Sequence, residues 1–150
     1  MKKFVVDLLN LYHCPMHFGA FVMRMAFGFL FLTIALQELR HGYGTFAQTL
    51  MTGDYQIVKD MPAALVMTYG YLLPAAELTA GVLLISNQLP KVAYSIAALI
   101  YLSFILGQGY DGNTAKVGSE YIPALLAVVV SYFINDYVVQ NEESGHGRWF

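Results

Sequence analysis

The chain has 150 residues, of which 57% are hydrophobic and only 12% are charged, and its formal net charge is −2. Soluble domains carry roughly 25% charged residues, so this composition excludes a water-exposed surface over most of the chain and predicts lipid as its solvent. The sequence has no run of basic residues, so nucleic acid is not an expected partner. Cys14 is the single cysteine, which excludes an internal disulfide.

The N-terminal residues form a short amphipathic pattern. After two lysines, apolar residues recur at helical spacing from Phe4 to Tyr12, and Asp7 and Asn10 interrupt them. No small-residue cleavage site follows. We therefore expect a retained helix that lies in the membrane interface, not a signal peptide.

Four apolar stretches follow, each close to the roughly 20 residues that a helix needs to cross a bilayer. We expect transmembrane helices at about residues 18–38, 62–86, 91–108 and 120–139, followed by a polar tail over 140–150. The prediction is a single all-α membrane domain over residues 1–150, built as a four-helix transmembrane bundle. A long polar loop from Gln37 to Met61 would join the first two helices, and a tight turn over residues 86–90 the next two.

The positions of lysine and arginine predict the orientation. Lys2, Lys3, Lys91 and Arg148 would lie on one side of the membrane, and Arg40, Lys59 and Lys116 on the other. The bias is slight. It favours a multi-pass protein of the cell inner (plasma) membrane with both termini in the cytoplasm.

Each predicted span carries one stripe of small or polar residues at helical spacing. The stripes contain Arg24, Gly28, Phe31, Ala35 and Glu38; Gly70, Pro74, Glu77, Gly81 and Leu84; Tyr94, Tyr101 and Gln108; and Glu120, Ala124, Ala127, Ser131 and Asn135. Because small residues allow close helix approach and polar groups need partners away from lipid, we expect all four stripes to face the inside of the bundle.

Arg24 and Glu77 are the charged residues deepest within the predicted spans. If the first and second helices end level with each other, the two side chains lie at similar depth. An unpaired charge there costs at least about 2.5–3.5 kcal/mol, so we expect an Arg24–Glu77 ion pair. Tyr101 and Ser131 would complete its polar network. The pair could act in function or serve only to fix helix register.

A second polar cluster is expected at the helix ends. It would contain Gln37, Glu38, Gln108 and Glu120, together with Arg40 and His41.

The segment His13-Cys14-Pro15-Met16-His17 offers soft ligands of the kind that bind copper or haem. Its proline interrupts the helix between the two histidines, so we favour a plain helix end over a metal site. The four histidines lie outside the predicted spans, so an intrinsic haem inside the bundle is not expected either.

Arg24 followed by Gly28, and Glu77 followed by Gly81, stand in apolar helices, and this pattern resembles the DoxX/DoxD family of small four-helix membrane proteins. The resemblance extends over about residues 18–137. Where that family usually has a lysine near the end of its first helix, this chain has Glu38-Leu39-Arg40. The resemblance implies a membrane subunit of a respiratory or oxidoreductase complex that acts near the quinone pool, with thiosulfate:quinone oxidoreductase as the example.

On this hypothesis Arg24 would stabilise negative charge on a quinone oxygen or a sulfur oxyanion. Glu77 would tune Arg24 or relay a proton with the help of Tyr101, and Ser131 would contact the same ligand. Quinone is then the expected cofactor, and membrane lipid and other membrane subunits are the expected partners. The alternative is a non-catalytic assembly or anchoring subunit of a larger membrane complex, and a small transporter is a third option.

Overall fold

The computed structural model describes residues 15–42, 44–53 and 55–143, and these ranges contain helices and no strand. The four long helices are α2 (Pro15–His41), α5 (Ala63–Ser86), α6 (Pro90–Tyr110) and α8 (Ile122–Glu143). Within the described residues, four helical segments are long and apolar enough to cross a membrane, the fourth running from Thr114 to Gln140. The predicted all-α bundle with four spans is confirmed. The predicted interfacial helix lies outside the described residues.

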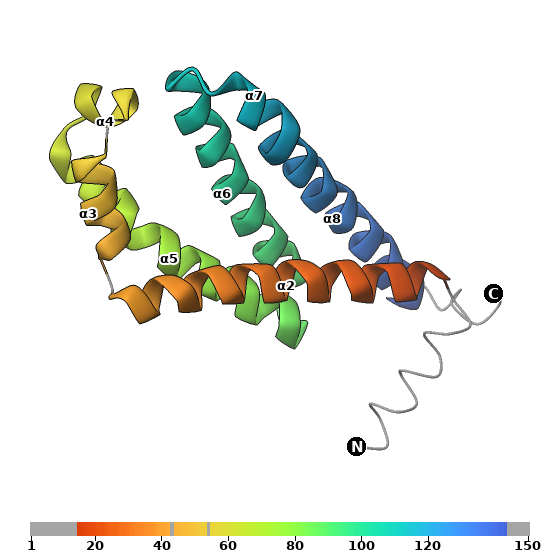
Figure 1. The fold of residues 1–150 in the computed structure, drawn as a ribbon. Helices are drawn as coiled ribbons and strands as arrows, with labels where there is room; N and C mark the ends of the chain where they lie inside the picture. Colours follow the sequence, from red (N-terminus) through yellow and green to blue (C-terminus); the bar gives the residue numbers. More distant parts are fainter. Residues whose placement is uncertain (1–14, 43, 54, 144–150) are drawn as a thin grey trace.

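The long helices contact one another in a closed series (Figure 1). α2 packs on α5, α5 on α6, α6 on α8, and α8 returns to α2. α6 and α8 run side by side, while α2 passes obliquely across the other long helices. The short helices α3 (Thr45–Thr52) and α4 (Gln56–Asp60) lie beside the N-terminal half of α5 and the C-terminal end of α6.

The buried side chains follow the predicted stripes closely. In α5 the whole stripe is buried: Gly70, Pro74, Glu77, Gly81 and Leu84. In the other helices the buried members of the predicted stripes include Phe31, Ala35, Tyr94, Tyr101, Ser131 and Asn135. Glu120 is the exception, because it is exposed. It lies in η1 (Val117–Tyr121), a π-helical segment whose wider turns change the direction in which its side chains point.

Gly28 and Gly81 mark the crossing of α2 and α5. A Cβ atom at Gly28 would lie 3.3 Å from the Gly81 carbonyl oxygen, and one at Gly81 would lie 3.0 Å from the Gly28 carbonyl oxygen. Small residues are the usual means by which two membrane helices bring their backbones together. The glycines therefore set the register of the two helices.

The stretch from Gln37 to Met61 is not the loop that we expected. α2 continues to His41, and α3 and α4 occupy most of the remainder. α3 packs its fully buried Ala47 against Gly70 of α5, which leaves no room there for a Cβ. The prediction was wrong because it considered the overall polarity of this segment and did not consider that α3 has one apolar side.

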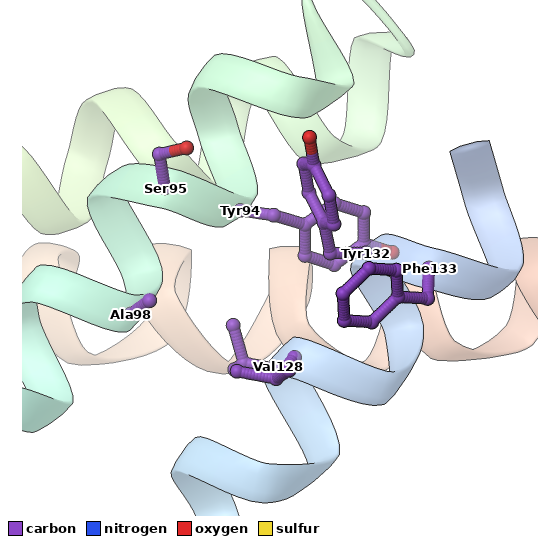
Figure 2. Close-up of a pocket in the computed structure, with 7 residues that line it drawn as sticks. Tyr94, Ser95, Ala98, Val128, Tyr132 and Phe133 are labelled. Atoms are coloured by element: carbon purple, nitrogen blue, oxygen red, sulfur yellow. The ribbon is translucent and has the colours of Figure 1, made fainter.

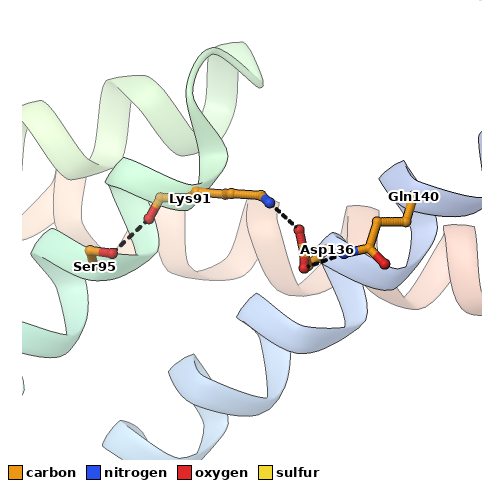
Figure 3. A network of polar contacts seen from close by, with 4 residues as sticks. All are labelled: Lys91, Ser95, Asp136 and Gln140. Atoms are coloured by element: carbon orange, nitrogen blue, oxygen red, sulfur yellow. Dashed lines mark hydrogen bonds and ion pairs between the residues drawn. The ribbon is translucent and has the colours of Figure 1, made fainter. Parts of the chain in front are cut away.

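The α5–α6 turn is confirmed: α5 ends at Ser86 and α6 begins at Pro90. Its residues Asn87 and Leu89 both have positive φ angles, of 55° and 48°. Directly after it, Lys91 Nζ forms an ion pair of 2.5 Å with Asp136 Oδ1 of α8 (Figure 3). Gln140 Nε2 donates a hydrogen bond of 2.8 Å to the other oxygen of Asp136. The ion pair holds the start of α6 against the C-terminal half of α8, and the Gln140 bond positions the Asp136 carboxylate.

Candidate functional site

Among the residues whose burial the structure describes, Glu77 is the only buried carboxyl residue. Its side chain is 2% exposed, and its Oε2 atom is buried without a hydrogen-bond partner. α5 remains helical through Pro74, although proline has no amide hydrogen for the carbonyl of Gly70. Glu77 is thus held by a continuous helix one turn after a break in the backbone hydrogen bonding.

Glu38, in the last turn of α2, is the electrostatic neighbour of Glu77. Its Oε2 atom is also buried without a hydrogen-bond partner. Glu38 lies on the wall of a groove of about 310 Å³ between α2 and α3, which we call the carboxyl groove. The groove is lined by Ile34, Gln37, Glu38, His41, Thr45, Phe46 and Thr49. A buried carboxyl group therefore interacts electrostatically with one that lines an open groove.

Two tyrosines interact electrostatically with Glu77. Tyr69 lies on the same helix, and its hydroxyl is 2.8 Å from Ser103 Oγ of α6. Because Ser103 donates its own hydrogen to the carbonyl of Ile100, at 2.7 Å, the tyrosine hydroxyl is the donor of that bond. Tyr101 is 8% exposed. We refer to Glu38, Glu77, Tyr69, Tyr101 and Ser103 as the carboxyl cluster.

Aromatic packing fixes the ring of Tyr101. Its centroid lies 5.8 Å from that of Phe31 and 6.4 Å from that of Phe104. Phe104 in turn packs on Tyr121 of η1, at 5.5 Å. Ring contacts therefore link Tyr101 to α2 through Phe31 and to η1 through Phe104.

Arg24 does not form the expected ion pair with Glu77. It donates a hydrogen bond from Nη1 to the Asn87 side chain in the α5–α6 turn, and its guanidinium lies 5.8 Å from the centroid of the Phe21 ring. Arg24 precedes Gly28 by four residues, and Glu77 precedes Gly81 by four. Because α2 and α5 are antiparallel and meet at these glycines, the two side chains lie about 6 Å from the crossing in opposite directions. The prediction failed because it assumed that the helices end level.

Ser131 is fully buried, but its hydroxyl donates to the carbonyl of Ala127 in its own helix, at 2.6 Å. Of the four residues predicted to form one site, the structure therefore brings Glu77 and Tyr101 together and leaves Arg24 and Ser131 elsewhere. The chemical roles assigned to all four stay predictions.

The second polar cluster expected at the helix ends is not assembled as a unit. Gln37 and His41 do line the carboxyl groove with Glu38. Gln108 instead accepts a hydrogen bond from Asn113, at 3.1 Å, and Glu120 is exposed. The expectation treated all helix ends on one side as one site, whereas α2 passes obliquely across the other helices and its end lies apart from theirs.

The sequence did not indicate that the hydroxyl of Tyr94 would be buried without a hydrogen-bond partner. Tyr94 is 1% exposed, and its hydroxyl is buried without a hydrogen-bond partner. Its heptad spacing from Tyr101 and Gln108 correctly placed it inside the bundle, yet gave no sign of a cavity. Tyr94 lines a second groove, of about 180 Å³, between α6 and α8 (Figure 2).

The metal-like segment is only partly described. His13 and Cys14 lie outside the described residues, while Met16 and His17 belong to α2. Within the described part of the chain, no group of three or more His, Cys, Asp and Glu side chains is gathered in a way that could hold a metal ion.

Residues 16–119, more than two thirds of the chain, match the family model described as methylamine utilisation protein MauE. The chain belongs to the MauE family. The matched range runs from the start of α2 into η1 and includes all five residues of the carboxyl cluster. Comparison with curated proteins and with solved structures gives no match.

The MauE match overturns the resemblance to DoxX/DoxD, and the thiosulfate chemistry implied by that resemblance has no support. The spacings Arg24–Gly28 and Glu77–Gly81 misled because glycines at helix crossings occur in membrane proteins of many kinds. With its four apolar helices, this MauE-family chain is a multi-pass membrane protein. Membership of this family supports the prediction that the chain is a membrane subunit of an oxidoreductase system.

Proposed function

We propose that this MauE-family protein is a membrane subunit of a methylamine-oxidising system, and that it takes up and releases protons at Glu77. The family description supports the first part. The second is supported by two observations: the carboxyl group of Glu77 is buried without a hydrogen-bond partner for its Oε2 atom, and it interacts electrostatically with Glu38, which lines an open groove.

Amine oxidation produces protons as well as electrons. Methylammonium and water give formaldehyde, ammonium, two protons and two electrons. In this proposal a partner subunit breaks the C–H bond and passes on the electrons. The MauE-family chain supplies carboxyl groups that accept protons in the membrane and return them to water.

The surroundings of Glu77 favour a protonated resting state. A charged carboxylate at this depth costs at least about 2.5–3.5 kcal/mol. An ionised Glu38 would also repel an ionised Glu77. The arginine expected to neutralise Glu77 is bonded to Asn87 instead. In this proposal Glu77 is protonated at rest and passes its proton towards Glu38.

Glu38 provides the exchange with water, because it lies on the wall of the carboxyl groove. Tyr69 and Tyr101 interact electrostatically with Glu77, and in this proposal their hydroxyls shift with the proton. We further propose that the protein lies in the inner (plasma) membrane with both termini in the cytoplasm. α2 then runs outward, and the carboxyl groove opens on the outer side.

The test combines spectroscopy with growth. Infrared difference spectra of the purified protein in lipid should show the C=O stretch of a protonated carboxyl group, and Glu77→Gln should remove it. Glu120→Gln is the matched control, since this glutamate is exposed on η1. In the native host, Glu77→Gln and Glu38→Gln should slow growth on methylamine, while Glu120→Gln should not.

Normal growth of the Glu77→Gln strain, with normal amounts of protein, would contradict proton handling. If Glu77→Gln instead lowers the amount of the assembled complex in proportion to growth, the anchoring alternative replaces the proposal. Quantitative immunoblotting of membranes separates these outcomes.

A further inference from the structure

His41 is the second titratable residue on the wall of the carboxyl groove. Among the seven residues that line the groove, Glu38 and His41 are the two that can gain and lose protons. Glu38 is partly exposed, yet its Oε2 atom is buried without a hydrogen-bond partner, whereas His41 is exposed. The two residues therefore differ in their access to water, and Glu38 is the more enclosed.

Helical geometry brings Glu38 and His41 together. They are three residues apart in the last turn of α2. Residues at this spacing lie on the same side of a helix, with about 5–6 Å between their Cβ atoms. Since both residues also line one groove, a proton can pass between them directly or through one water molecule.

The backbone after His41 fixes the end of α2. Gly42 follows with a φ angle of 109°, and its amide donates a hydrogen bond of 3.2 Å to the carbonyl of Leu39. The Thr45 hydroxyl donates to the backbone carbonyl of His41, at 2.9 Å. These contacts use no side-chain atom of His41, so the helix does not need the imidazole ring in order to end there.

The remainder of the groove has room for water between these groups. Its volume of about 310 Å³ compares with about 30 Å³ for each molecule of liquid water. The hydroxyls of Thr45 and Thr49 donate to backbone carbonyls, so what they offer to water is an acceptor oxygen. Neither threonine changes its charge near neutral pH. These residues can therefore hold water, whereas a net proton needs Glu38 or His41.

We propose that His41 carries protons between Glu38 and bulk water, an inference that rests on the proposed function of Glu77. The O–H bond of protonated Glu38 breaks as an N–H bond forms on the imidazole, which leaves a carboxylate and an imidazolium. The imidazolium then gives its proton to water or buffer and becomes neutral again. Histidine suits this step because it accepts and releases protons near neutral pH. The neighbouring Arg40 does not, because arginine stays protonated in proteins.

The experiment follows the carboxyl band of Glu77 in infrared spectra of the full chain in lipid nanodiscs. When heavy water replaces ordinary water in dilute buffer, the band shifts as deuterium replaces the proton, and the rate of this shift is measured. His41→Gln should slow the shift at least about tenfold, because groove water alone remains as the route. Arg40→Gln is the matched control. It removes an exposed charge from the same helical turn, outside the groove, and should leave the rate unchanged.

Imidazole added to the buffer separates a proton carrier from a structural role. It should restore the rate of His41→Gln in proportion to its concentration, because free imidazole can enter the groove and carry the proton. Sodium chloride at the same concentration should have no such effect. Imidazole should not restore Glu38→Gln, which lacks the preceding carboxyl group. Thermal unfolding shows whether each variant is folded.

The role of His41 is overturned if His41→Gln exchanges as fast as the wild type, or if Arg40→Gln slows exchange equally. It is also overturned if imidazole leaves the slow rate of His41→Gln unchanged. Failure of the proposed function gives a different result. In that case the wild-type spectrum contains no carboxyl band that Glu77→Gln removes, and the role of His41 falls with it.

Discussion

Gly28 and Gly81 face each other where α2 crosses α5: a Cβ atom at Gly81 would meet the backbone of α2, and one at Gly28 would meet the Ile85 side chain, at 2.7 Å. A Cβ at Gly81 would lie 2.9 Å from the amide nitrogen of Leu32, which is closer than such atoms approach in folded proteins. The atoms in the way belong to backbone, so a side-chain movement cannot relieve the clash.

Gly81→Ala should therefore destabilise the protein by about 1–3 kcal/mol, because the two helices must move apart. Gly107→Ala is the control, since no atom lies within 4 Å of a Cβ at that position. It should leave stability unchanged or raise it by up to about 1 kcal/mol. Thermal unfolding in mild detergent measures both variants. Equal unfolding temperatures for Gly81→Ala and the wild type would show that the helices do not meet at this glycine.

Asn87 has two roles that a pair of variants can separate. It accepts the hydrogen bond of Arg24, and it ends α5 in the left-handed conformation, with φ 55° and ψ 26°. Asn87→Gly removes the side chain but tolerates that conformation, so the loss should be at most about 1 kcal/mol. Asn87→Ala should lose about 1–2 kcal/mol more. If thermal unfolding shows alanine to be as stable as glycine here, the turn does not have this shape.

Asp111 holds α4 against the end of α6. Its Oδ1 atom accepts a hydrogen bond of 3.0 Å from the amide of Ile57, and the neighbouring Tyr110 hydroxyl donates to Asp60, at 2.8 Å. Asp111→Ala should weaken this attachment by about 1 kcal/mol, which speeds amide hydrogen exchange in α4 about 5-fold.

Hydrogen exchange read by mass spectrometry gives that rate for the peptide containing Ile57. Asn113→Ala is the matched control from the same loop, because it removes only a bond to Gln108. The prediction fails if both variants change exchange in α4 equally, or if neither does.

The fold was largely predictable because each span carries a complete apolar segment with one small or polar stripe. The α5 stripe containing Glu77 and Gly81 was placed correctly in full. The offset between helices was not predicted, although Gly28 and Gly81 carried the signal: antiparallel helices that meet at two glycines place the preceding Arg24 and Glu77 on opposite sides of the crossing. The Arg24–Glu77 ion pair was predicted wrongly because the helices were aligned by their ends and not by the contact between Gly28 and Gly81.

The candidate sites were less predictable than the fold. Glu38 was placed at a helix end, but its approach to Glu77 depends on the crossing of α2 and α5. Tyr94 reads in the sequence as one more aromatic residue, and its unpartnered hydroxyl appears only when α8 packs beside α6. Spacing along one helix predicts which face is buried, whereas a cavity depends on two helices together.

The family match ends at residue 119, just before α8. The carboxyl cluster lies within the matched range, whereas one wall of the groove between α6 and α8 lies beyond it: Val128, Val129, Tyr132 and Phe133. A chimera that keeps residues 1–119 and takes its last helix from another family member would keep the carboxyl groups of this protein and replace one wall of that groove.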